Sequence, residues 1–335
     1  MSNMEIMYYI LGSALILAVI IDLLWTTLWV DGGAGWFTDR LTTSIWKLMR
    51  RVDKQVFYNL TGPIILALTL FSWVLLLWIG ASLFFSGNPD AIVNSSTNQS
   101  IEGLEVAYYS GFTLFTLGVG DYTAQTLLFK IATVLISGIG MLLLTFSASY
   151  IISVVGAVVS KRSLARSIMG IGKNSTQFLK NAWNGKDFSQ LDLLLSSINS
   201  QITELTLQTQ AFPLVQYYHS EDIEKTATVA IAVLDEALST LRYGLKNKNL
   251  VNMTLLRSNQ SSIKNYLDTS IDGYGNQVDG IDAIPDAMNL SALIELEIPL
   301  VSQDIYSKQI QELDDRRNEL LIILTIDNHK WPNKK

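Results

Sequence analysis

The sequence predicts an all-α membrane protein with a separate all-α cytoplasmic domain, and three observations lead to this fold class. Three stretches in the first half are apolar and long enough to cross a bilayer, which takes roughly 20 helical residues. Charged residues make up only 16% of the 335-residue chain and are concentrated after residue 160. The second half shows apolar residues at helical spacing, without an apolar run of membrane length.

The predicted membrane helices cover residues 8–30, 63–85 and 127–159. The first lacks the basic start and small-residue cleavage site of a signal peptide, so we expect an extra N-terminal transmembrane helix that is retained. The third exceeds the thickness of a bilayer core, so one end should protrude. Lys and Arg are frequent in residues 31–62 and after residue 160 but absent from residues 86–115. This distribution predicts a multi-pass cell-membrane protein with its N-terminus outside and its C-terminus in the cytoplasm.

The connection in residues 32–61 is predicted to form an amphipathic helix. Basic residues fall mainly between apolar ones, which recur at helical spacing at Phe37, Leu41, Ile45, Leu48, Val52 and Val56. We expect this helix to lie on the inner leaflet, and the alternative is packing on the cytoplasmic domain. Asp22 is the only acid within the first apolar stretch. It either snorkels to the interface or pairs with a basic residue of the connection, Arg50, Arg51 or Lys54.

An apolar and aromatic segment in residues 101–115 is too short to span a bilayer. We expect a re-entrant helix that returns as extended chain, since irregular backbone at membrane depth survives only inside protein or along a watery path. Gly118 and Gly120 follow it, and glycine adopts backbone angles that place successive carbonyls on one side. Rings of such carbonyls can replace the hydration shell of an alkali cation.

The hexapeptide TLGVGD, from Thr116 to Asp121, resembles the filter of the tetrameric pore-loop potassium channel family, usually Thr-x-Gly-Tyr/Phe-Gly-Asp. In that family an aromatic pair and a serine precede the filter, as residues 108–110 do here. Gly140 occupies the position of the family's hinge glycine in the inner helix. The resemblance covers residues 63–160 and implies a potassium-channel-like pore built from an outer helix, a pore helix, a filter and an inner helix.

The same resemblance implies roles for individual residues. Backbone carbonyls, with the Thr116 hydroxyl, would bind potassium ions in stacked sites at Thr116, Leu117, Gly118 and Val119. Gly120 would belong to the same ion-binding selectivity filter and keep its outer mouth open. Asp121 would raise the local cation concentration and bond to the pore-helix aromatics. Tyr108 and Tyr109 would hold the filter at its diameter.

Val119 departs from the family pattern, because the aromatic ring that normally braces the filter is missing. The backbone carbonyls still supply the ligands, so we expect potassium conduction with a less strict rejection of sodium. A non-selective monovalent cation channel is the alternative function. One filter motif supplies a quarter of a coordinating ring, so we expect a homotetramer.

The gate is expected near the inner end of the third membrane helix, where converging helices could close at Ile152, Val155 and Gly156. Gly140 would supply a hinge, as in the family it resembles. No helix carries regularly spaced arginines, so we expect no voltage sensor. The expected domains are an N-terminal transmembrane helix, an interfacial helix, an ion-channel pore domain and a helical cytoplasmic domain, in residues 1–31, 32–61, 62–160 and 161–335.

The cytoplasmic half leaves its ligand open, because it has no Gly-x-Gly-x-x-Gly after a strand. A run of acidic side chains without neighbouring bases would suit calcium, or would form a solvated loop, at Asp268, Asp272, Asp279, Asp282 and Asp286. Basic residues follow the third membrane helix and either contact anionic lipid or merely mark the inner side, at Lys161, Arg162 and Arg166.

Composition argues against other function classes. The chain has no cysteine and two histidines, and no nucleophile–base set or metal cluster emerges, so we expect neither an enzyme nor a cofactor beyond potassium ions. Two further readings are a non-conducting membrane sensor or scaffold and a subunit of a potassium-uptake transporter. The complete filter motif argues against the first, and the presence of one loop rather than four argues against the second.

Overall fold

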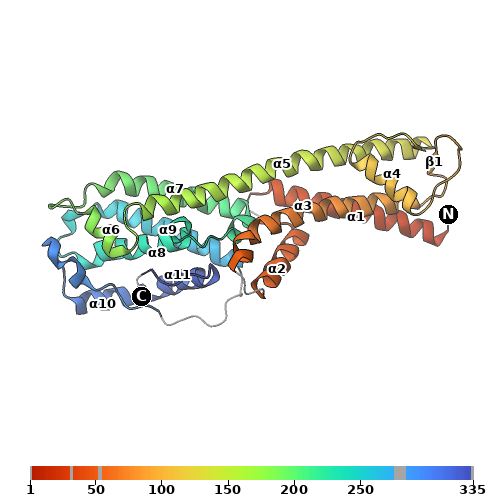
Figure 1. The fold of residues 1–335 in the computed structure, drawn as a ribbon. Coiled ribbons are helices and arrows are strands. Elements are labelled where there is room, and N and C mark those ends of the chain that lie inside the picture. The colour runs from red at the N-terminus through yellow and green to blue at the C-terminus, as the bar shows by residue number, and fades with distance from the viewer. Residues whose placement is uncertain (1, 31–32, 52–54, 275–283, 333–335) are drawn as a thin grey trace. The chain divides into compact units, whose positions relative to one another are not determined.

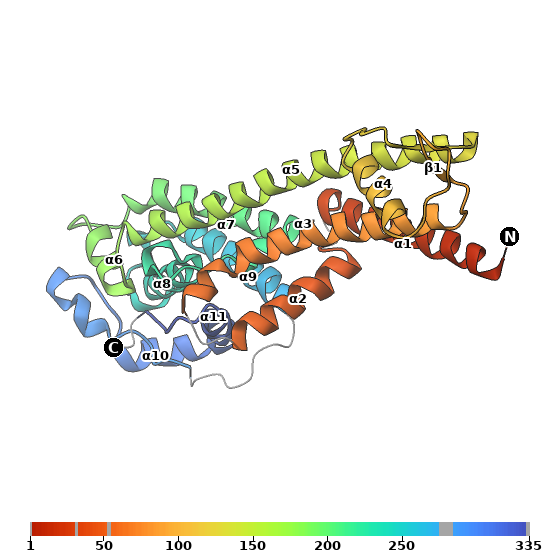
Figure 2. The same cartoon turned by 45° about the vertical axis from the view of Figure 1, so that its right-hand side comes forward.

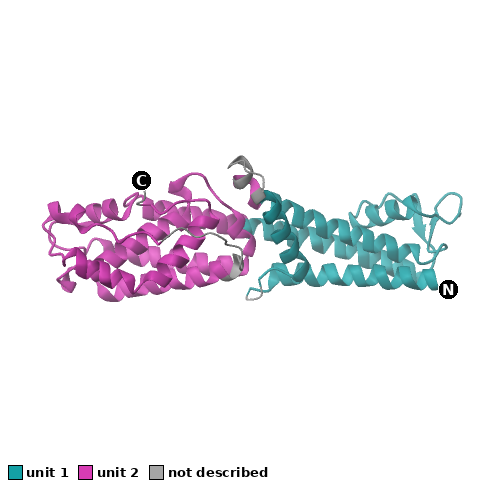
Figure 3. Cartoon of the chain, turned by 90° about the horizontal axis from the view of Figure 1, so that it is seen from below, with its two compact units in different colours: residues 1–51, 63–154 teal, residues 52–62, 155–335 magenta. Residues whose placement is uncertain are grey.

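The computed structural model describes residues 2–30, 33–51, 55–274 and 284–332. It confirms the predicted all-α membrane fold, since three of the described helices are long and apolar enough to span a membrane, over Asn3–Leu28, Asn59–Ser86 and Leu127–Met169. The chain forms two compact units (Figure 3). The membrane unit consists of residues 1–51 and 63–154, and the C-terminal unit consists of residues 52–62 and 155–335.

In the membrane unit, α1 (Asn3–Leu28) packs along α3 (Gln55–Ser86) (Figure 1). A Cβ atom on Gly12 would lie 2.7 Å from the Gly80 carbonyl oxygen. Small residues at a crossing let two membrane helices approach closely, which explains this contact. The core beside the crossing contains fully buried Trp73 and Phe85.

The connection between the first two membrane helices differs from the expectation. The predicted helix of residues 32–61 is observed as α2 (Trp36–Arg51), and the chain from Gln55 onward already belongs to α3. Pro63, expected at the start of the second membrane helix, lies inside α3. A proline removes one backbone hydrogen bond, but membrane helices tolerate this loss where neighbouring chain covers the site.

The pore loop has the expected re-entrant form. The short helix α4 (Leu104–Leu114) packs on α3, where the Trp78 indole nitrogen donates to the Ala107 carbonyl at 2.7 Å. A two-stranded antiparallel ribbon brackets the loop, and β1 (Ile92–Asn94) pairs with β2 (Tyr122–Ala124). The chain between α4 and β2 is therefore held at both ends.

The C-terminal unit is all-α, as predicted. Its central helix is α8 (Ala227–Ser239), in which every residue is buried. Helices α7 (Leu191–Ala211) and α9 (Met253–Tyr274) lie side by side (Figures 1 and 2). The other described helices of this unit are α6 (Ser175–Ala182), α10 (Gln303–Gln311) and α11 (Asp314–Ile326). Helix α5 (Leu127–Met169) runs without a break from the membrane unit into this one.

Candidate functional site

The predicted filter adopts an alternating backbone. Thr116, Gly118 and Gly120 have φ angles of 57°, 59° and 86°, while the residues between them are not among those with positive φ. A Cβ atom on Gly118 would meet nothing within 4 Å. Glycine is therefore favoured at this position by its positive φ angle and not by a lack of room for a side chain. Left-handed angles at alternate positions turn successive carbonyls toward one side of the chain. Thr116 adopts such an angle without being glycine, which is a strained conformation of the kind found at functional sites.

Both ends of the filter are anchored. The Leu117 amide donates to the Phe112 carbonyl at 2.8 Å, which fixes the base on the pore helix. Ser95, directly after β1, donates its hydroxyl to the Gly120 carbonyl at 2.7 Å and its amide to the Asp121 carbonyl at 2.9 Å. Sequence reasoning missed Ser95, because this polar loop residue is 25 residues from Gly120 and its neighbours in the sequence do not indicate that contact. The carbonyl oxygen of Gly120 thus accepts a hydrogen bond from the Ser95 side chain.

The filter is open on one side of the single chain. Leu117 and Val119 are 68% and 52% exposed, and the Asp121 side chain is also exposed. A cavity of about 540 Å³ lies beside the segment, lined by Thr116, Gly118 and residues of α4 and α5. Apolar side chains exposed together in this way mark an interaction surface.

The pore-helix tyrosines have different surroundings. Tyr109 is buried, and its hydroxyl lies 2.6 Å from that of Thr133 in α5. Tyr108 is half exposed and packs edge-to-face on Tyr122, with ring centroids 6.0 Å apart. Tyr109 therefore joins the pore helix to the inner helix rather than bonding to Asp121.

The inner helix presents the residues expected at a cavity and a gate. Ile152 and Val155 are exposed along one side of α5, and a Cβ atom on Gly156 would meet nothing within 4 Å. Gly140 is different, because a Cβ atom there would overlap the Leu114 carbonyl oxygen at 1.8 Å. Gly140 thus lets the end of the pore helix pack on α5, and its role as a hinge stays a prediction.

Comparison with known proteins agrees with this geometry. Residues 64–157 match the family model described as ion channel. This chain belongs to the pore-loop ion-channel family. The uncharacterized membrane protein YdjJ of Bacillus subtilis (strain 168) is 37% identical to the channel over 327 residues, which are 97% of this chain and 95% of the relative. No solved structure matches the channel.

Asp22 of the channel anchors the start of α2. Its Oδ1 accepts hydrogen bonds from the backbone amides of Phe37 and Thr38 at 2.9 and 3.3 Å. Its Oδ2 accepts from the Thr38 hydroxyl at 2.5 Å and from the Trp73 indole nitrogen at 2.9 Å. Asp22 is 6% exposed, so the snorkelling interpretation is wrong. This carboxylate ties α1, α2 and α3 together.

The pairing of Asp22 with a basic residue stays a prediction, because Lys54 and the side chains of Arg50 and Arg51 lie outside the described residues. Helix α2 buries Thr38, Thr42 and Trp46, a different face from the predicted apolar stripe, whose residue Leu48 is exposed. Its position on the inner leaflet stays a prediction.

Lys161 differs from its expected role at a lipid surface. It is 7% exposed, and its ammonium donates to the carbonyls of Val215 and Tyr218 at 3.3 and 3.2 Å. Its burial leaves it unavailable to a lipid headgroup, whereas Arg162 and Arg166 are exposed. The Tyr218 ring in turn packs on the start of α3, where a Cβ atom on Gly62 would lie 2.5 Å from Cδ2.

The next residue, His219, makes a buried hydrogen bond. His219 Nδ1 lies 2.7 Å from Asp327 Oδ1, and the Thr228 hydroxyl donates to Asp327 Oδ2 at 2.6 Å. Burial raises the pKa of Asp327, but the hydrogen bond and charge of His219, with Lys161 and Thr228, lower it to about 2. These bonds join the end of α11 to α8 and to His219, which directly follows the residues whose carbonyls bind Lys161.

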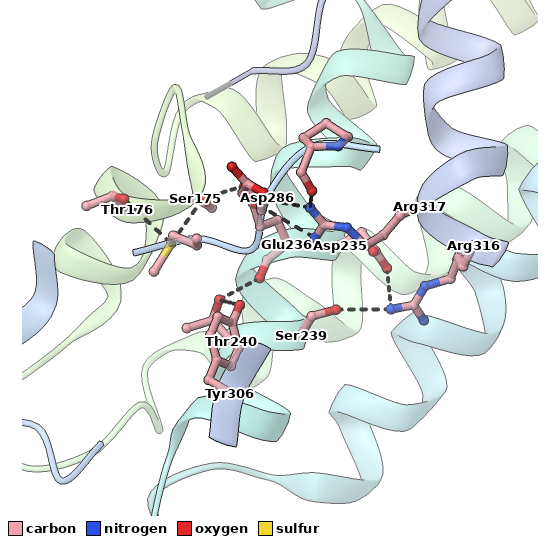
Figure 4. Close-up of polar contacts among 12 residues, drawn as sticks. Ser175, Thr176, Asp235, Glu236, Ser239, Thr240, Asp286, Tyr306, Arg316 and Arg317 are labelled. Carbon is pink, nitrogen blue, oxygen red and sulfur yellow. Dashed lines mark hydrogen bonds and ion pairs between the residues drawn. The ribbon is translucent and has the colours of Figure 1, made fainter. Parts of the chain in front are cut away.

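A second buried charge cluster holds α8 to α11 (Figure 4). Arg316 lies 3.0 Å from Asp235 and also donates to the Ser239 hydroxyl at 3.0 Å. Burial raises the pKa of the Glu236 carboxyl, which accepts from the Ser175 hydroxyl at 2.9 Å. Arg317 donates to the carbonyls of the chain at residues 285–286. These bonds fix the interior of the C-terminal unit.

The described residues contain no group of three side chains that could hold a metal ion. Two aspartates of the expected calcium loop, Asp279 and Asp282, lie outside the described residues, as does the side chain of Asp272. Calcium binding by this loop stays a prediction.

Proposed function

We propose that the protein is a homotetrameric potassium channel, with its filter open to the outside and its C-terminal unit in the cytoplasm. The alternating positive φ angles at Thr116, Gly118 and Gly120 carry this proposal, because they align a column of carbonyl groups as ligands for a dehydrated cation. Thr116, Leu117, Gly118 and Val119 supply the potassium sites.

The exposed filter supports assembly around a shared axis. One chain contributes one strand of ligands, and the apolar side chains of Leu117 and Val119 remain uncovered on that strand. Four copies complete the coordinating ring and cover these side chains. The exposed stripe of α5 that includes Ile152 and Val155 then lines the path below the filter and closes it.

The contacts of Lys161 support control by the C-terminal unit. Lys161 belongs to the same unbroken helix as Ile152 and is bonded to the chain beside Tyr218. A movement of the chain beside Tyr218 would therefore act on α5 through Lys161.

A non-selective cation channel is the second candidate, and Val119 favours it. The side chain is aliphatic and half exposed, so it supplies neither the ring nor the hydroxyl that would brace the filter. The carbonyl ring would then adapt to sodium as well as to potassium.

The reversal potential of the purified channel in a planar bilayer, with potassium on one side and sodium on the other, tests both candidates. We expect a value near the potassium equilibrium potential. A value near zero with clear single-channel steps would establish the non-selective channel. Gly118→Ala is the negative control, because a side chain at a φ of 59° strains the backbone of the filter. Tetramers that conduct no better than this variant would identify a non-conducting sensor or scaffold.

A further inference from the structure

A cavity of about 610 Å³ lies in the membrane unit between α1 and the turn that leads into α2. Its walls are mainly apolar and include Leu15, Ala18, Val19, Trp25, Trp36 and Leu76. Asp22 is the charged residue of the lining, but both of its carboxylate oxygens already accept hydrogen bonds from protein donors. The Asp22 carboxylate is therefore satisfied by protein, and an apolar occupant suits the mainly apolar walls.

The cavity opens beside a helix of membrane length, which determines the medium around it. Ile21 lines it and is 62% exposed, on a helix that is long and apolar enough to span a membrane. The medium outside such a helix is lipid hydrocarbon. An apolar cavity is a poor site for water, which needs two to four polar partners. An acyl chain of the bilayer fills it without that cost.

The charge beside the cavity indicates the kind of lipid. The Arg40 guanidinium lies over the Trp36 ring at 4.2 Å from its centroid, and Trp36 is itself a wall of the cavity. Arg40 is exposed, so its remaining donors face outward. An exposed guanidinium at a membrane surface pairs with a phosphate, and basic residues there favour anionic headgroups.

We propose that this cavity binds an anionic phospholipid, with one acyl chain between α1 and α2 and the headgroup phosphate at Arg40. The proposal goes beyond conduction and takes from the proposed function only the orientation, which puts the site in the cytoplasmic leaflet. Trp25 and Trp36 flank the site, as aromatic side chains do at the level of the headgroups. The lipid thereby joins the N-terminal helix to α2 beside the Asp22 contacts.

Native mass spectrometry of the full-length channel, delipidated and then incubated with equal amounts of phosphatidylglycerol and phosphatidylcholine, tests the site. We expect the wild type to retain phosphatidylglycerol in preference. Arg40→Gln should weaken phosphatidylglycerol binding about fivefold, the worth of one basic residue at a membrane surface. Ala18→Phe should reduce retention of both lipids, because the ring occupies the cavity.

Lys47→Gln is the matched control, since Lys47 is exposed on the same helix seven residues further on. Equal losses in Arg40→Gln and Lys47→Gln would mean general attraction to a charged surface and would overturn the site. Unchanged retention in both Arg40→Gln and Ala18→Phe would also overturn it. A change of oligomeric state in Ala18→Phe, with lipid retention unaltered, would show that a second copy of the chain covers the cavity. None of these readouts depends on conduction, so they separate this inference from the channel proposal.

Discussion

The ammonium of Lys161 lies 3.2 Å from the carbonyl oxygen of Tyr218, whose ring packs on Gly62 at the start of α3. Tyr218 therefore contacts residues of two helices within the C-terminal unit, Gly62 of α3 and Lys161 of α5. Because Lys161 is buried, the contact requires its charge to be satisfied by these carbonyls rather than by water. This relationship makes Lys161 the first residue to test for coupling.

Replacing Lys161 with Met should destabilise the C-terminal unit by about 1–3 kcal/mol, because two buried carbonyls lose their donor. We also expect a changed open probability in single-channel recordings. Arg162→Gln is the control, since Arg162 is exposed and a surface substitution usually changes stability by less than about 0.5 kcal/mol. Equal stability and equal open probability in the two variants would argue against coupling through Lys161.

The buried contact of Asp327 with His219 predicts a pH dependence of stability. The pKa of Asp327 in the folded channel, about 2, lies below the ordinary value of 3.8. A lowered carboxyl pKa gives stability that is fully present above pH 4 and is lost as the pH falls from about 4 to about 2. The contribution is about 2 kcal/mol. Thermal unfolding of the wild type and of Asp327→Asn should differ at pH 6 and converge near pH 2; a constant difference would contradict the assignment.

Gly140→Ala should disable the pore. The added methyl group would overlap the Leu114 carbonyl oxygen, so the pore helix must move away from α5 and carry the filter base with it. Gly138→Ala is a matched control two residues away, because a Cβ atom there would meet nothing within 4 Å. Cation flux into liposomes should be lost in the first variant and kept in the second. Flux retained in Gly140→Ala would mean that the close packing is dispensable.

Asp22→Asn should loosen the start of α2. The amide keeps one acceptor oxygen, so at least one of the donors from Phe37, Thr38 and Trp73 loses its charged partner, at a cost of about 1.5–3 kcal/mol. Hydrogen exchange at the Phe37 and Thr38 amides should become more than tenfold faster. Asp39→Asn, on the exposed side of the same helix, should leave these rates unchanged.

The sequence predicted the elements whose cause is local and missed those whose cause lies in distant chain. The spans follow from apolar length, and the filter follows from six consecutive residues. The burial of Lys161 was not predictable, since its partners lie more than fifty residues along the chain. For the same reason the sequence left Asp22 open between snorkelling and a basic partner, and it gave no sign of the hydrogen bonds from Phe37, Thr38 and Trp73. The distance of Gly140 from the filter along the chain predicts a hinge, but its contact with Leu114 depends on how α4 meets α5 and cannot be read from the sequence.

The continuity of α5 sets the angular relation between two of its own side chains, Ile152 and Lys161. The helix is unbroken from Leu127 to Met169 and turns by about 100° per residue. Nine residues separate Ile152 from Lys161, so their side chains point about 180° apart around the helix axis. The side of α5 that is exposed at Ile152 is thus opposite to the side that Lys161 uses to bind Tyr218. A single residue inserted between them would rotate one face out of phase by about 100°, whereas four residues would nearly restore the phase.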